Sequence, residues 1–104
     1  MQDIWTVLAS ANIEIVLSGH DHTYERFAPL DANGKPNPKG IRSFVIGTGG
    51  RSLYAFSNPH PHSQSKQNSS LGVSKFTLEP NGYSWEFIAA NGSDFKDNGT
   101  GKCY

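Results

Sequence analysis

Two histidines one residue apart, His20 and His22, stand directly behind the apolar run 13-IEIVLS-18 and Gly19. In an extended backbone, residues i and i+2 face the same side, so the two imidazoles can point to one place. Neutral imidazole binds zinc, iron, manganese and copper. Asp21 alternates to the opposite face and is not expected to be a ligand. The spacing predicts a metal site beyond the end of a strand, with a pair of exposed turn histidines as the alternative.

The segments before the histidines must deliver them to that position. Residues 3–11 carry apolar side chains at spacings of three and four, with Asp3 as the expected N-cap, and predict a short amphipathic helix. Asn12 is expected to end this helix. The β-branched, mostly apolar run 13–18 then predicts a buried strand, whose carboxyl end carries the histidines.

The segments after the histidines predict further strands. Residues 31–40 consist of turn formers, and residues 41–50 form a second strand that ends in a glycine cluster. Two runs with strand-like alternation, 71–80 and 83–92, flank Asn81-Gly82, the strongest short-range signal for a β-hairpin.

The remaining segments predict no regular structure. Residues 58–70 are rich in Ser, Asn, Gln, His and Pro and predict a mobile surface loop, and residues 94–104 form a polar, glycine-rich tail. With 104 residues, the chain is expected to form a single domain over 1–104. The fold class predicted is α/β, with one N-terminal helix and a mixed, mostly antiparallel β-sheet.

Composition excludes several classes of function. The formal net charge is zero, so bulk electrostatics give no reason to expect nucleic acid or an anionic membrane as a partner. No apolar run approaches the roughly 18 residues of a membrane span, and no signal peptide is recognisable at the N-terminus. The single cysteine, Cys103, cannot form a disulfide within this chain and is expected to be an idle thiol, not a ligand.

The block 17-LSGHDHTYER-26, followed by 47-GTGG-50 at a second strand end, resembles the calcineurin-like metallophosphoesterase family. It is most similar to the purple-acid-phosphatase-like branch, in which a strand is followed by Gly-His-x-His and often by Tyr-Glu-Arg. The resemblance continues through the hairpin to the tail ending Gly-Thr-Gly-Lys-Cys. It implies a four-layer α/β/β/α sandwich, of which this chain corresponds to the half with the second sheet. Members of the branch are often secreted or periplasmic.

The resemblance also implies roles for particular residues. His20 corresponds to a ligand of one metal of a dinuclear centre of Fe, Zn or Mn, and His22 to a ligand of the other. Such a metal pair hydrolyses a phosphoester substrate. Tyr24, Glu25 and Arg26 are expected to lie around the ligands or to have a structural role, and a Glu-Arg pair could orient the histidine loop.

The family's other ligands are absent from this sequence. They belong to earlier blocks (Asp-x-His, Gly-Asp, Gly-Asn-His and a further histidine), so the chain resembles the C-terminal part of a phosphatase and is expected to be inactive alone. A second pair, His60 and His62, lies between prolines in a polar segment where the family has no ligand. We expect a solvated loop there, with substrate contacts by these two histidines as the alternative.

Three hypotheses of function stay open: an incomplete phosphoesterase segment, a stand-alone metal-binding or assembly module, and an enzyme that recruits its missing ligands from another polypeptide. A cupin-like metal site is disfavoured, because Glu25 follows His22 too closely and the initial helix fits poorly. A sheet face without its partner sheet would expose apolar residues and favour a homo-oligomer. The residues expected on this exposed face are Phe44, Ile46, Phe76, Trp85 and Phe87.

Overall fold

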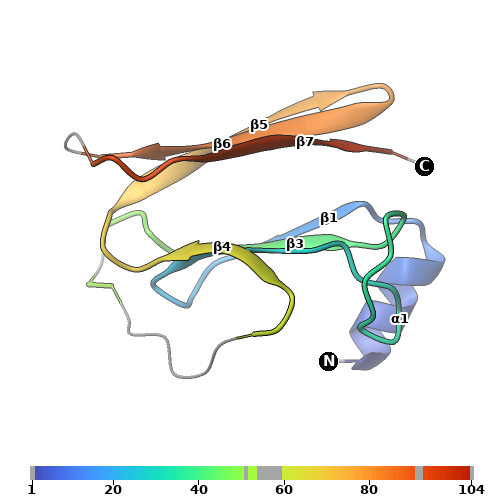
Figure 1. The fold of residues 1–104 in the computed structure, drawn as a ribbon. Coiled ribbons are helices and arrows are strands. Elements are labelled where there is room, and N and C mark those ends of the chain that lie inside the picture. Colours follow the sequence, from blue (N-terminus) through green and yellow to red (C-terminus); the bar gives the residue numbers. More distant parts are fainter. Residues whose placement is uncertain (1, 51, 54–59, 91–92, 104) are drawn as a thin grey trace.

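The computed structural model describes residues 2–50, 52–53, 60–90 and 93–103, which form one helix and two β-sheets (Figure 1). In chain order the elements are α1 (Gln2–Ser10), β1 (Ile15–Ser18), β2 (Tyr24–Phe27), β3 (Arg42–Ile46), β4 (Ser63–Gln67), β5 (Gly72–Glu79), β6 (Gly82–Ala89) and β7 (Asp97–Lys102). The α/β class predicted from the sequence is confirmed, but the strands are divided between two sheets where one was expected.

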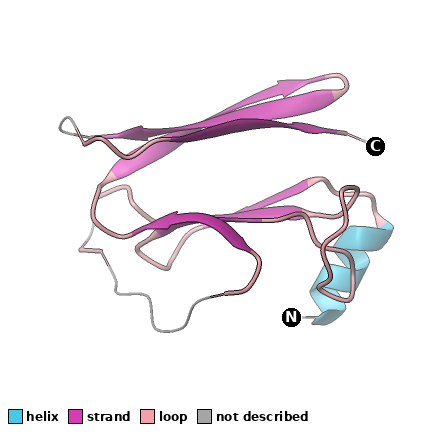
Figure 2. Cartoon of the chain, in the orientation of Figure 1, coloured by secondary structure: helices cyan, strands magenta, loops and turns pink. Residues whose placement is uncertain are grey.

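The two sheets differ in topology and lie one above the other (Figure 2). The first sheet has the order β1-β3-β2-β4, in which β1 and β3 are parallel and the other neighbours are antiparallel. The second sheet is an antiparallel meander with the order β5-β6-β7. In the parallel pair, the carboxyl ends of β1 and β3 lie at the same end of the first sheet.

Helix α1 begins one residue earlier than predicted, so Asp3 lies in its first turn and is not the N-cap. Asn12 ends it as expected, with a left-handed φ of 58°. The amide of Asn12 donates to the carbonyl of Ala9, and the amide of Ile13 donates to that of Leu8, which is the Schellman arrangement. At nine residues, α1 is too short to cross a bilayer, and no membrane-spanning helix occurs elsewhere in the described residues.

The predicted hairpin is confirmed. Strands β5 and β6 pair along their whole length, from Gly72 opposite Ala89 to Glu79 opposite Gly82. The turn between them consists of Pro80 and Asn81, one residue earlier than the predicted Asn81-Gly82, because Gly82 already pairs with Glu79 as the first residue of β6.

The core lies between the two sheets and consists largely of aromatic side chains. The buried members are Tyr24, Phe44, Tyr83, Trp85 and Phe87, with Ile15, Ile46, Phe76, Ala89 and Phe95 packed against them. The prediction that Phe44, Trp85 and Phe87 contribute to an exposed apolar face was therefore wrong. The chain itself supplies a second sheet, formed by β5, β6 and β7, that covers them.

The sequence does not predict three of the strands, because their residues are polar or their runs are short. Residues 63–67, expected in a loop, form β4 and pair with β2, and residues 97–102, expected in a tail, form β7 and pair with β6. Residues 24–27 form β2 in the middle of the first sheet. Backbone hydrogen bonding to a neighbouring strand determines these segments, and side-chain hydrophobicity does not reveal it. Residues 58–59 of the expected loop lie outside the described residues.

Candidate metal centre

The histidine loop, Gly19–Thr23, follows the carboxyl end of β1 and lies against the segment that follows β3. Ser18 is opposite Val45 in the parallel register, so the two strands end at nearly the same level. The amide of Gly47 donates to the carbonyl of Thr23 at 2.9 Å. Two further bonds tighten the loop itself, from the amide of Asp21 to Gly19 and from the amide of Thr23 to Asp21. The chain therefore brings the histidine block and the glycine block together at the sheet edge.

Gly47 is required by this close approach. A Cβ atom at this position would lie 1.9 Å from the backbone oxygen of Asp21 and 2.7 Å from its carbonyl carbon. Neighbouring Thr48, which is fully buried, then ties the loop to the second sheet: its hydroxyl donates to the carbonyl of Gly72, whose amide donates back to Thr48. Gly47 and Thr48 thus hold the histidine loop against the first sheet and connect it to the second sheet.

His20 has a backbone conformation that favours glycine. Its φ is 75°, in the left-handed region, which costs a side-chain-bearing residue about 1 kcal/mol. The side chain is exposed, so burial does not repay this cost. Residues held in this way are frequent at binding and catalytic sites. His20 therefore combines a strained backbone with a side chain that is not buried.

His22 is oriented by a backbone carbonyl. Its Nδ1 lies 2.7 Å from the carbonyl oxygen of Ser52. A carbonyl only accepts hydrogen bonds, so Nδ1 must carry the proton, and in the neutral ring Nε2 then carries the lone pair. Metal-binding histidines typically have one ring nitrogen fixed in this manner while the other binds the metal. The tautomer of His22 is therefore the one that a metal ligand needs.

The second histidine pair lies at the other end of β2. His22 precedes β2, whereas the ring of His60 stacks edge-on against Phe27, the last residue of that strand, with 4.9 Å between ring centroids. The Nδ1 of His60 accepts a hydrogen bond from the amide of His62, which leaves the proton of the neutral ring on Nε2. This arrangement disfavours metal binding by His60 through Nε2. The structure does not bring His60 and His62 to the histidine loop.

The described residues supply too few ligands for a complete centre. No group of three or more His, Cys, Asp or Glu side chains suited to a metal occurs among them. A catalytic zinc ion generally has three protein ligands. His20 and His22 fit the metal chemistry as individual imidazole donors, but the described part of the chain does not contain a closed site.

Tyr24 and Arg26 do not point toward the histidine loop but into the space between the sheets, where they meet a residue that sequence reasoning missed. Asp97, at the start of β7, accepts hydrogen bonds from the hydroxyl of Tyr24 at 2.5 Å and from Nε and an Nη of Arg26 at 2.8 and 3.0 Å. The indole nitrogen of Trp85 lies 3.3 Å from the same carboxylate. We call these four residues the Asp97 cluster. The expected structural role of Tyr24 and Arg26 has a physical basis in these contacts between sheets.

The electrostatics of the Asp97 cluster favour a charged carboxylate. Burial alone raises the pKa of Asp97, but the hydrogen bonds from Arg26 and Tyr24 and the positive charge of Arg26 outweigh it, so the pKa lies below its usual value. Burial, together with the bond to Asp97 and its negative charge, raises the pKa of Tyr24 well above its usual range. Tyr24 therefore stays a neutral donor and Asp97 a charged acceptor.

Glu25 behaves differently from its two neighbours. Because side chains alternate along β2, the side chain of Glu25 lies on the face opposite to those of Tyr24 and Arg26. Glu25 pairs with Val45 of β3 and with Lys66 of β4. It therefore belongs to the outer face of the first sheet. The adjacent Glu25 and Arg26 do not form the pair that was considered as an orienter of the histidine loop.

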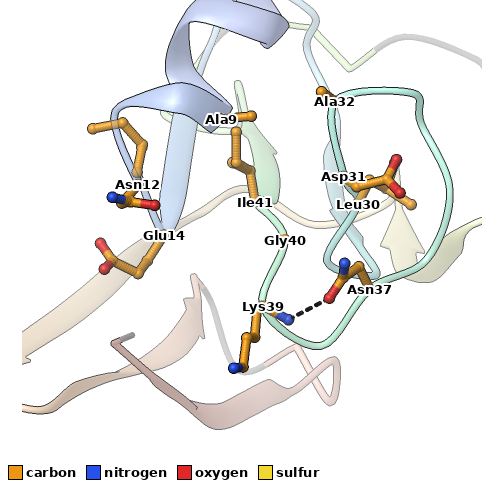
Figure 3. Close-up of a pocket in the computed structure, with 11 residues that line it drawn as sticks. Ala9, Asn12, Glu14, Leu30, Asp31, Ala32, Asn37, Lys39, Gly40 and Ile41 are labelled. Atoms are coloured by element: carbon orange, nitrogen blue, oxygen red, sulfur yellow. Dashed lines mark hydrogen bonds between the residues drawn. The ribbon is translucent and has the colours of Figure 1, made fainter.

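A separate pocket of about 370 Å³ lies at the opposite end of β1, between the end of α1 and the turn 31–40 (Figure 3). Glu14, Asp31 and Lys39 contribute polar groups to its wall. Neither His20 nor His22 lines it, so it is distinct from the candidate metal centre.

Comparison with known proteins agrees with the resemblance in part. Over 45 residues, the chain is 44% identical to purple acid phosphatase 21 of Arabidopsis thaliana. The match spans 43% of this chain but only 10% of that much longer protein. No family model matches the chain, and no solved structure matches it. The chain is thus similar to part of a purple acid phosphatase.

Proposed function

We propose that the chain is the C-terminal, ligand-bearing part of a dinuclear-metal phosphoesterase, with His20 bound to one metal ion and His22 to the other. The observation that carries this proposal is the Nδ1 contact of His22 with the Ser52 carbonyl, since it leaves the metal-binding lone pair on Nε2. The left-handed backbone of His20 and the position of both residues in the loop that follows β1, beside the carboxyl end of β3, support it. The local similarity to a purple acid phosphatase supports the class of reaction.

The metals fit the donors that this chain offers, but the chain alone does not complete their coordination. A dinuclear centre supplies a hydroxide nucleophile near neutral pH and clamps the phosphoester. This chain would contribute one imidazole to each ion and hold the second ring in its correct tautomer through Ser52. The remaining ligands would come from outside the described residues, so we expect no phosphoester hydrolysis by the chain alone.

The test combines metal content with hydrolysis of p-nitrophenyl phosphate. The chain is purified alone and together with a polypeptide that carries the missing Asp-x-His, Gly-Asp and Gly-Asn-His blocks, and each preparation is loaded with Zn²⁺, Mn²⁺ or iron. We expect turnover only in the combined preparation, with about two metal ions per chain. Hydrolysis by the chain alone would contradict its incompleteness, and stoichiometric metal without turnover in both preparations would favour a binding module.

Matched variants identify the ligands within that preparation. His20→Ala and His22→Ala are each expected to abolish binding of one metal ion and to lower turnover at least about 100-fold. His60→Ala and His62→Ala serve as controls, since they change the same residue type in the same spacing at the other end of β2. Equal losses from both pairs of variants would refute the assignment.

A further inference from the structure

Three Asn-x-Ser/Thr triplets occur in the sequence, and they begin at Asn68, Asn91 and Asn98. This triplet is the acceptor sequence for N-linked oligosaccharides, but so short a motif also occurs by chance. The environment of each triplet in the fold therefore has to distinguish a usable acceptor from a chance match. Asn91 lies outside the described residues, so the comparison is between Asn68 and Asn98.

The side chain of Asn98 lies on the outer face of the second sheet. Asp97, the residue before it, points between the sheets to Tyr24, so alternation along β7 turns Asn98 to the opposite face. Thr100 follows two residues later and shares that face. Both side chains are exposed, and neither has a hydrogen-bond partner among the described residues. Both line a depression of about 450 Å³. The acceptor amide and the hydroxyl of this triplet are therefore accessible, with space beside them.

The neighbouring strands complete this outer face with polar residues. In the register of the sheet, Glu86 lies between Lys75 and Asn98, and Ser84 lies beside Thr100. On β6 these polar residues alternate with the buried aromatic residues of the core. Such alternation is typical of an antiparallel sheet with one face in water. A further strand paired with β7 would bind its backbone in the plane of the sheet, so the exposure of Asn98 does not depend on β7 being an edge.

We propose that Asn98 is the acceptor of an N-linked oligosaccharide. The donor is a polyprenyl-diphosphate-linked oligosaccharide, which an oligosaccharyltransferase uses in a secretory compartment. The amide nitrogen Nδ2 of Asn98 forms a bond to the anomeric carbon of the first sugar, and the bond from that carbon to the diphosphate oxygen breaks. Polyprenyl diphosphate leaves, and one amide proton passes to a base of the transferase. Thr100 supplies the hydroxyl that the triplet requires. The inference does not depend on metal binding or on the proposed function.

Packing explains the middle residue of the triplet but not the asparagine. A Cβ atom at Gly99 would lie 2.5 Å from the ring of Trp85, so glycine is needed there. Asparagine is disfavoured in strands, and Asn98 has no hydrogen bond from its side chain to a described residue that would offset this. An oligosaccharide on its amide would extend from the outer face into water and displace no core side chain. The modification is thus compatible with the fold.

The triplet at Asn68 is held in a local turn. The side-chain oxygen of Gln67 accepts hydrogen bonds from the amides of Ser69 and Ser70 at 2.8 and 2.7 Å, and its nitrogen donates to the carbonyl of Ser70 at 2.9 Å. These contacts join residues no more than three apart, so they form without the rest of the fold. The triplet at Asn98 is instead ordered by the pairing of β7 with β6. Because the transferase acts on an unfolded segment, Asn98 stays a substrate for longer than Asn68.

The test is mass spectrometry of the chain secreted from insect cells behind a host signal peptide. Trypsin cleaves after Lys96 and Lys102 and releases residues 97–102, which contain only the triplet at Asn98. We expect most copies of this peptide to carry the mass of an oligosaccharide, and peptide N-glycosidase to remove it. The intact glycopeptide is measured, because Asn98-Gly99 can also deamidate spontaneously and an aspartate at this position would not be evidence.

Matched variants identify the acceptor. Asn98→Gln and Thr100→Ala are each expected to abolish the oligosaccharide on residues 97–102, whereas Thr100→Ser retains the hydroxyl and is expected to retain part of the occupancy. Thr77→Ala changes the same residue type on the same exposed face outside any triplet and is expected to leave occupancy unchanged. Asn68→Gln is also expected to leave it unchanged. Circular dichroism verifies that each variant is folded.

Three outcomes would overturn the inference. They are an unmodified peptide 97–102 in the secreted protein or in protein isolated from the cells that make it, an oligosaccharide confined to Asn68 or Asn91, and an equal loss in Thr77→Ala and Thr100→Ala. An oligosaccharide on residues 97–102 that requires both Asn98 and the hydroxyl of residue 100 would support it.

Discussion

The histidine loop ends at Thr23 and the next residue, Tyr24, belongs to the Asp97 cluster, yet the two regions differ in exposure, backbone strain and hydrogen bonding. The loop is mostly exposed, has a strained residue at His20, and presents donors that no described residue completes as a metal site. The cluster is buried, and its carboxylate receives bonds from three other side chains. One region is an exposed loop with a strained residue, and the other is a buried structural link between the two sheets.

Removal of the Asp97 carboxylate is expected to have the largest effect on stability. Asp97→Ala leaves Arg26, whose side chain is only 15% exposed, without its ion-pair partner, and it removes the acceptor for Tyr24 and Trp85. We expect the free energy of unfolding to fall by about 3 kcal/mol in urea denaturation. Asp94→Ala, at an exposed position nearby, is the control and is expected to change it by less than about 0.5 kcal/mol. Similar effects of both would remove the distinction between the cluster and the surface.

Addition of a methyl group at Gly47 is expected to have the next largest effect on stability, since Gly47 packs against the histidine loop. Gly47→Ala forces the backbone of Asp21 to move, and we expect a loss of about 2 kcal/mol. Gly49→Ala, two residues further on, meets no atom within 4 Å and serves as the matched control. Measurement of both by thermal unfolding distinguishes a tightly supported loop from a loosely attached one, and equal stability would indicate the latter.

Acid is expected to weaken the Asp97 cluster by less than the substitutions above, because a protonated carboxyl retains part of its hydrogen bonding. The pKa of Asp97 is lowered by folding, so its contribution to stability is complete above the ordinary value of 3.8. It is lost as pH falls from there through the folded pKa. The stability difference between the wild type and Asp97→Asn should therefore shrink below about pH 4. A difference that stays constant between pH 6 and pH 2.5 would show that the carboxylate charge has no part in holding the sheets.

The smallest effect is expected in the histidine loop, and it has the opposite sign. His20→Gly relieves the left-handed backbone strain and is expected to raise the free energy of unfolding by about 1 kcal/mol. Asp21→Gly, at a position outside the left-handed region, is expected to lower it slightly, which makes it a suitable control. Destabilisation by His20→Gly would mean that the imidazole contributes to folding, and the contrast with the Asp97 cluster would disappear.

The sequence predicted the elements whose residues carry their own signals. Three local signals each correspond to an element of the structure, because propensity and turn chemistry act over a few residues. They are the spacing in 3–11, the apolar run before the histidines and Asn81-Gly82. The strands β4 and β7 had no such signal, since polar residues form them through pairing with β2 and β6.

By itself, the sequence determined the histidine pair, its place after a strand and its likeness to part of a phosphatase. Only the tertiary structure decided which residues surround it: the Ser52 carbonyl that orients His22, and the separation of His60 from the loop. It also decided that Tyr24 and Arg26 donate hydrogen bonds to Asp97, which lies 73 and 71 residues away in sequence. The physical reason is that a local motif records backbone geometry, whereas hydrogen-bond partners and burial depend on segments that meet only when the two sheets pack together.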